Sequence, residues 1–173
     1  MRIILVTGLP ATGKTTLARA LAARYGAPLL AKDLVKEWLM DSIGPVDAAR
    51  SRQLSDMSFT MLFAQLAETA NAGVDAILDG NFRAGQHEAA LRDLADVRIA
   101  QVICRLDEVT RQQRIAMRAG DPARHAGHGE ARAGIDPSND CFLDLAGPQL
   151  THAGDADAAA LQALLQQLDQ WWR

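Results

Sequence analysis

The sequence predicts an α/β fold in three layers, with helices on both faces of a five-stranded parallel sheet. Strand-like and helix-like segments alternate along the 173 residues, which is typical of a parallel sheet because each crossover between parallel strands carries a helix. A glycine-rich motif also stands between the first predicted strand and the first predicted helix. We find no internal repeat and no linker, so residues 1–173 are interpreted as a single domain.

In the N-terminal half we expect a strand, a helix, a short strand and two more helices, at residues 2–7, 14–25, 28–31, 33–40 and 47–72. The first segment is apolar and β-branched, as in strands that are buried on both faces. Gly26 and Pro28 end the first helix. The long segment has apolar residues at helical spacing, and its Met57 and Met61 are expected to fill the core.

In the C-terminal half we expect a strand, a helix, a strand, a helix, a strand and a final helix, at residues 74–79, 86–94, 97–106, 108–117, within 146–154 and about 161–172. The final helix is amphipathic, because its leucines fall on one face. A polar, glycine-rich segment precedes the last strand, and long loops in compact domains are usually functional or disordered. We interpret residues 119–140 as a lid.

Residues 8–15 read GLPATGKT and match the Walker A pattern G-x-x-x-x-G-K-[ST] at every fixed position. The backbone N–H groups of such a loop surround phosphate oxygens, and the following helix N-terminus adds partial positive charge. Lys14 is expected to reach the β- and γ-phosphates of a nucleoside triphosphate. The predicted nucleotide-binding residues are Gly8, Leu9, Pro10, Ala11, Thr12, Gly13, Lys14, Thr15 and Thr16.

Asp79 ends the predicted strand 74–79 and is expected to hold Mg²⁺ together with the Thr15 hydroxyl. A strand-end turn former is the alternative interpretation of Asp79. Gly80 follows instead of a second acid, which disfavours a motor or a hydrolase. Asn81 and Arg83 are expected to shape the acceptor side, and a structural contact with the next helix is the alternative for Arg83.

Asp33 follows the second predicted strand, near the γ-phosphate side of the loop. A carboxylate there is suited to orient an acceptor hydroxyl and take its proton. The alternative is a plain helix cap. Lys32 and Lys36 are either solvated lysines, which is the favoured interpretation, or neutralise substrate charge, and Lys36 is kept as a candidate substrate-binding residue.

Arg111, Arg114 and Arg118 share one face of the helix expected at 108–117, and Arg124 follows in the lid. Arginines that close over a γ-phosphate stabilise the charge of phosphoryl transfer, and closure excludes water. Arg114, Arg118 and Arg124 are therefore the predicted catalytic arginines, beside Lys14. A solvated helix face is the alternative.

The chain resembles the small P-loop kinases, a group that includes gluconate and shikimate kinases, chloramphenicol phosphotransferase, zeta toxins and polynucleotide 5′-hydroxyl kinases. The resemblance rests on GLPATGKTTLA at 8–18, Asp33, ILDGNFR at 77–83 and RHAGH at 124–128. It implies a P-loop NTPase fold in which Asp33 activates the hydroxyl, Thr15 and Asp79 serve the metal, and lid arginines grip the phosphates. Lys36 and Ala11 depart from the arginine and glycine that several members carry there.

The sequence therefore predicts an ATP-dependent phosphotransferase that moves the γ-phosphoryl group of ATP to a hydroxyl of a small molecule, with Mg²⁺ as cofactor. The alternatives are a polynucleotide 5′-hydroxyl kinase and a non-catalytic nucleotide-binding switch. The net charge of −3 argues against a broad nucleic-acid surface. With two distant cysteines, no membrane-spanning stretch and no leader, we expect a cytoplasmic protein. The acceptor and the oligomeric state are not specified by the sequence.

Overall fold

The computed structural model describes residues 1–44, 46–119, 125 and 140–173. Within these residues, five parallel strands form one sheet in the order β2-β3-β1-β4-β5. The strands are β1 (Arg2–Gly8), β2 (Leu29–Ala31), β3 (Ala76–Asp79), β4 (Arg98–Arg105) and β5 (Gln149–Ala153). The predicted α/β class, with its five-stranded parallel sheet, is confirmed.

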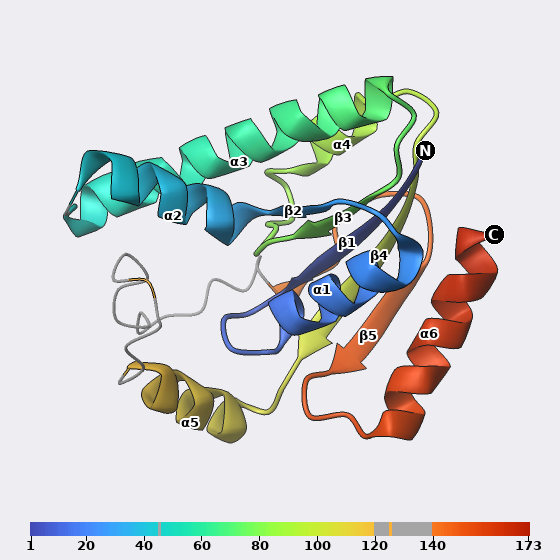
Figure 1. The fold of residues 1–173 in the computed structure, drawn as a ribbon. Coiled ribbons are helices and arrows are strands. Elements are labelled where there is room, and N and C mark those ends of the chain that lie inside the picture. Colours follow the sequence, from blue (N-terminus) through green and yellow to red (C-terminus); the bar gives the residue numbers. More distant parts are fainter. Residues whose placement is uncertain (45, 120–124, 126–139) are drawn as a thin grey trace.

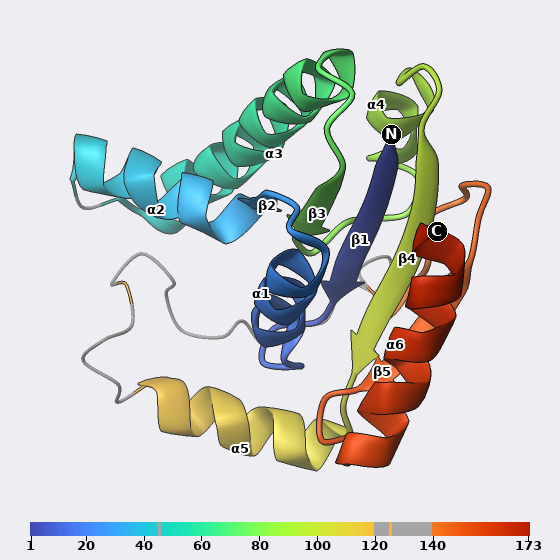
Figure 2. The same cartoon turned by 45° about the vertical axis from the view of Figure 1, so that its right-hand side comes forward.

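Helices cover both faces of the sheet (Figures 1 and 2). They are α1 (Lys14–Tyr25), α2 (Lys32–Ile43), α3 (Ala48–Asn71), α4 (Glu88–Arg92), α5 (Glu108–Ala119) and α6 (Ala158–Trp172). Alternate residues of β1 face opposite layers: Ile3 and Leu5 pack with α3 and α4, whereas Ile4 and Val6 pack with α1 and α6. This alternation produces two apolar cores, one on each side of the sheet.

Most of the expected elements are present, with shifted ends. Helix α2 continues past residue 40 to Ile43, and Gly44 follows it with φ +80°, whereas α4 is shorter than the expected 86–94. The expectation for Met57 and Met61 is wrong: these side chains are 46% and 42% exposed. The reason is that other positions of α3, including Phe59, Leu62 and Leu66, form its buried face.

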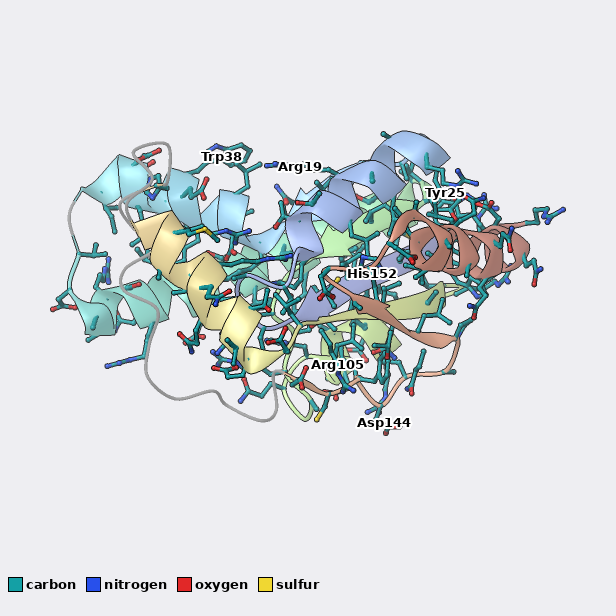
Figure 3. All side chains as sticks on the ribbon, turned by 90° about the horizontal axis from the view of Figure 1, so that it is seen from below. Arg19, Tyr25, Trp38, Arg105, Asp144 and His152 are labelled. Atoms are coloured by element: carbon teal, nitrogen blue, oxygen red, sulfur yellow. The ribbon has the colours of Figure 1, made fainter. Side chains whose placement is uncertain are left out.

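The carboxyl ends of the parallel strands meet at one edge of the sheet, where ligands bind in folds of this class. Helix α5 lies across this edge in Figures 1 and 2, and Figure 3 looks onto it from that side. The segments after β1, β2, β3 and β4 all begin at this edge.

No helix among the described residues is long and apolar enough to cross a membrane.

Candidate functional site

The loop between β1 and α1 has a backbone that requires its glycines. Gly8 has φ +130°, and a Cβ added there would lie 2.3 Å from the carbonyl oxygen of Cys104. Gly13 has φ +92° at the start of α1. Ala11 is also held at positive φ, +69°, although only glycine adopts this region without a penalty. The loop therefore follows a path that leaves its backbone N–H groups available to an anion at the N-terminus of α1.

Side chains of the loop bond to its own backbone. Thr12 Oγ1 and Lys14 Nζ both donate hydrogen bonds to the carbonyl oxygen of Leu9, at 2.8 and 2.9 Å, whereas Pro10 and Thr16 are exposed beside them. Burial lowers the pKa of Lys14, and the charges of Asp79 and Asp33 partly oppose this shift. The Lys14 ammonium therefore lies over the loop, where phosphate oxygens of a bound nucleotide can replace the carbonyl as its partner.

Asp79 and Thr15 lie together at the end of β3, as predicted for the metal ligands. Thr15 Oγ1 donates a hydrogen bond of 2.6 Å to Asp79 Oδ2. Burial raises the pKa of Asp79, while the Thr15 hydrogen bond and the Lys14 charge lower it in part. Among the described residues, Asp79 Oδ1 is the one buried side-chain polar atom without a hydrogen-bond partner. An unpartnered carboxylate oxygen next to a hydroxyl matches the oxygen donors that Mg²⁺ prefers, so these residues fit the metal.

Asp33 lies in the first turn of α2, at the same edge of the sheet. The position before the helix is Ala31, which makes no side-chain cap bond, so the alternative interpretation of Asp33 as a helix cap is wrong. The Asp33 side chain is 55% exposed, and its negative charge acts to raise the pKa of both Lys14 and Asp79. Charged groups from three different elements, α1, α2 and β3, therefore lie within electrostatic reach of one another.

Lys32 and Lys36 differ from the favoured sequence interpretation. Lys32 is 4% exposed, so the expectation of a solvated lysine is wrong there. Lys36 is half-buried, and its Nζ donates a hydrogen bond of 2.9 Å to Ser51 Oγ on α3. This contact ties α2 to α3, and a role of Lys36 in substrate binding stays a prediction.

Asn81 and Arg83 follow β3 on the acceptor side of the predicted site. Asn81 is half-buried. Arg83 donates through its backbone N–H to Nδ1 of His87 at 2.9 Å, and its guanidinium contacts Gln86 at 3.4 Å. The structural contact considered for Arg83 is therefore present, and its contact with an acceptor stays a prediction.

The arginines of α5 have different surroundings. Arg111 is buried and donates two hydrogen bonds to Glu108, at 2.9 and 2.7 Å. Both terminal nitrogens of Arg114 lie 3.2 Å from the carbonyl oxygen of Gly154. Arg118 is exposed, and its charge lowers the pKa of Lys14. The charge of Arg118 therefore links this helix to the loop, while Arg124 and nearly all of the predicted lid lie outside the described residues.

Gly154, in the turn after β5, is a site residue that the sequence reasoning missed. Its N–H donates a hydrogen bond of 2.7 Å to the carbonyl oxygen of Arg105. A Cβ added to it would lie 2.2 Å from the carbonyl oxygen of Thr12. The turn thus packs directly on the glycine-rich loop. A single glycine after a weakly patterned strand carries no motif, and only its place after the last predicted strand could have indicated it.

Comparisons with known proteins agree with this geometry. Residues 3–133 match the model of a family described as an AAA domain. A putative kinase from Chloroflexus aurantiacus is 31% identical, with a TM-score of 0.84 over 96% of this chain and 97% of its own. A gluconokinase from Sinorhizobium meliloti shares the fold, with 17% identity and a TM-score of 0.54 over 98% of this chain and 94% of its own. The APS kinase of Mycobacterium tuberculosis, in complex with AMPPNP and APS, also shares it, with 19% identity and a TM-score of 0.60 over 97% of each chain. No curated protein matches the chain.

Proposed function

The chain belongs to the AAA_33 family of AAA domains, and from that premise we propose that it transfers the γ-phosphoryl group of ATP to a hydroxyl of a small molecule. Its small P-loop kinase-like fold supports a nucleotide-dependent kinase. The observation that carries the finer proposal is the meeting of Lys14, Asp33 and Asp79 at the carboxyl edge of the sheet, where the Asp33 charge acts on both other groups. A site that only bound nucleotide would not need an exposed carboxylate whose charge acts on both Lys14 and Asp79.

In the proposed reaction, the N–H groups of residues 8–13 and the N-terminus of α1 bind the phosphates. Lys14 exchanges its contact with the Leu9 carbonyl for oxygens of the β- and γ-phosphates. Asp33 accepts the proton of the acceptor hydroxyl while that oxygen bonds to the γ-phosphorus and the bond to ADP breaks. Arg118 stabilises the negative charge on the phosphoryl oxygens.

Thr15 Oγ1 and Asp79 Oδ1 are the groups that would hold Mg²⁺, Asp79 through a water molecule. When bound, the ion neutralises charge on the β- and γ-phosphates.

The proposal is tested by incubating the protein with Mg²⁺ and γ-labelled ATP in the presence of candidate acceptors. The panel contains sugars, sugar acids, adenosine 5′-phosphosulfate and an oligonucleotide with a free 5′-hydroxyl. We expect label to move to a small molecule. Label on the oligonucleotide alone would identify a polynucleotide kinase instead, and ATP binding without transfer to any acceptor would identify a nucleotide-binding switch.

Lys14→Ala is the variant that tests the role of the glycine-rich loop. We expect transfer to fall at least about 10³-fold, because the phosphates lose their principal cation. Circular dichroism should show an unchanged fold, since in the part of the chain that the structure describes the Lys14 side chain bonds only to the adjacent loop. Full activity of this variant would contradict the assignment of the loop.

A further inference from the structure

Lys32 is a buried lysine that directly precedes the proposed proton acceptor. It is the first residue of α2, and only 4% of its surface is exposed. Lysine is almost never fully buried unless it is paired, because the ammonium loses its hydration. The packing that holds Lys32 inside the protein must therefore supply a compensating partner.

Within the described part of the chain, the Lys32 ammonium has two neighbours that provide this compensation. Its Nζ lies 3.1 Å from Asp33 Oδ1 and 5.7 Å from the centre of the Phe59 ring on α3. Phe59 is itself buried and packs in a tilted arrangement against the ring of His87, with ring centres 4.1 Å apart. The ammonium is therefore held between a packed aromatic surface and an exposed carboxylate.

The stem of Lys32 is fixed as well. A Cβ added to Gly80 would lie 3.4 Å from the Cβ of Lys32, so the side chain passes close to the segment that leaves β3 after Asp79. Contacts from α3 and from this segment limit the positions that the ammonium can take. The Asp33 side chain, in contrast, is 55% exposed, so one end of the ion pair is buried while its carboxylate end reaches the surface.

We propose that Lys32 is a positioning residue, whose buried ammonium fixes the Asp33 carboxylate toward the acceptor hydroxyl. The inference deepens the proposed function and rests on the role given there to Asp33. Proton transfer needs the carboxylate within hydrogen-bond reach of the hydroxyl, and holding it there lowers the entropic part of the barrier. Lys32 itself touches neither ATP nor acceptor in this assignment.

The test is a double-mutant cycle of Lys32→Met and Asp33→Asn. Turnover is measured with Mg²⁺–ATP in two reactions. In one the acceptor is water, and in the other it is the panel compound that the original protein phosphorylates fastest. We expect Lys32→Met to lower kcat about 10- to 100-fold with the KM for ATP within about twofold of the original. In the Asp33→Asn background, the same substitution should lower kcat by less than about threefold, because Lys32 acts through the carboxylate that is already gone.

Arg92→Met is the matched control. It also removes a cation and an ion pair, to Asp144 at 2.7 Å, but it lies at the C-terminal end of α4, outside the site. Its kcat should equal that of the original protein in both backgrounds. Equal losses from Lys32→Met in both backgrounds would show that Lys32 does not act through Asp33 and would overturn the inference.

The same cycle in thermal unfolding requires no acceptor. Asp33→Asn should lower Tm by about 4 °C when Lys32 is present and by less than about 2 °C when Met replaces it, because only the first case leaves a buried ammonium without its carboxylate. Equal decreases would overturn the pairing. If Lys32→Met does not fold, Lys32→Gln takes its place in both cycles. A normal kcat for Asp33→Asn would instead contradict the proposed function and reduce the pair to a structural contact.

Discussion

Single residues of the site are held in unfavourable states. Asp79 is buried with one oxygen unpartnered among the described residues, and burial raises its pKa. Burial also lowers the pKa of Lys14. Ala11 is held at positive φ, where a side chain is strained. Each of these features lowers stability in the free protein. In the proposed function, bound phosphates and Mg²⁺ would compensate the buried charges of Lys14 and Asp79.

The variant Asp79→Asn distinguishes the effect of the Asp79 charge on the stability of the free protein from its effect on ligand binding. We expect the free protein to gain about 2–4 °C in Tm, because a neutral amide replaces a buried carboxylate that lacks a full set of partners. The increase in Tm caused by Mg²⁺–ATP should be lost, because the carboxylate proposed to hold the metal is gone. Differential scanning calorimetry with and without Mg²⁺–ATP measures both effects.

Asp144 provides the control for Asp79→Asn, because its side chain is 96% exposed and it lies outside the site. Asp144→Asn should keep the complete stabilisation by Mg²⁺–ATP. If Asp79→Asn also keeps it, Asp79 is not a metal ligand.

At the scale of helices and strands, the sequence predicted the order and type of the elements because apolar periodicity and glycine punctuation are local signals. The Walker A pattern likewise located the loop and, with the strand before it, the edge of the sheet. Other features depend on how elements cross. The burial of Lys32 follows from the packing of α2 on α3, and the exposure of Met57 follows from the rotation of α3 about its axis. The role of Gly154 follows from the contact of two turns that are distant in sequence. None of these has a local pattern.

The contact between the β5–α6 turn and the glycine-rich loop gives a prediction at this scale. Gly154→Ala would place a methyl group 2.2 Å from the Thr12 carbonyl oxygen, so one of the two segments must move. The movement also affects Arg114, which bonds to the Gly154 carbonyl. We expect the affinity for Mg²⁺–ATP, measured by isothermal titration calorimetry, to fall about tenfold or more, because displaced loop N–H groups bind phosphate less well.

Gly73→Ala is the comparison for Gly154→Ala. A Cβ at Gly73 meets nothing within 4 Å, but its φ of +67° is unfavourable for alanine. This variant should lose about 1 kcal/mol of stability and no ATP affinity. An unchanged affinity in Gly154→Ala would mean that the loop tolerates movement of the turn.

Over the whole molecule, the sheet separates two apolar cores, and the proposed acceptor side of the site is built on one of them. Phe59, Phe63 and Phe82 belong to the core formed with α3 and α4, and each has a ring contact with His87. His87 in turn accepts the hydrogen bond from the backbone of Arg83. The stability of this core and the shape of the segment from Asn81 to His87 are therefore coupled through one neutral imidazole.

This coupling predicts how the stability of the whole protein depends on pH. Burial, with a smaller effect of Arg83, lowers the pKa of His87 to about 4, whereas it is about 6.5 in the unfolded chain. Between these values the unfolded state binds the additional proton, so His87 contributes stability that is present above pH 6.5 and is lost as the pH falls toward 4. Between pH 7 and pH 4.5 the loss should be about 2 kcal/mol.

Urea unfolding at pH 7 and pH 4.5 tests this prediction by comparing the original protein with His87→Asn, whose side-chain oxygen can still accept from the Arg83 N–H. We expect His87→Asn to be less stable at pH 7, because the ring contacts with the phenylalanines are lost, yet to lose about 2 kcal/mol less on acidification. Carboxylates with lowered pKa that lie away from His87, including Asp75 and Asp169, also destabilise the protein at low pH, but they do so equally in both proteins. The half-buried His152 has a pKa lowered in the same direction, so His152→Gln should remove a smaller part of the loss. If the two proteins lose the same free energy between pH 7 and pH 4.5, then His87 is not held neutral by its burial, and the acceptor side does not depend on an uncharged ring at this position.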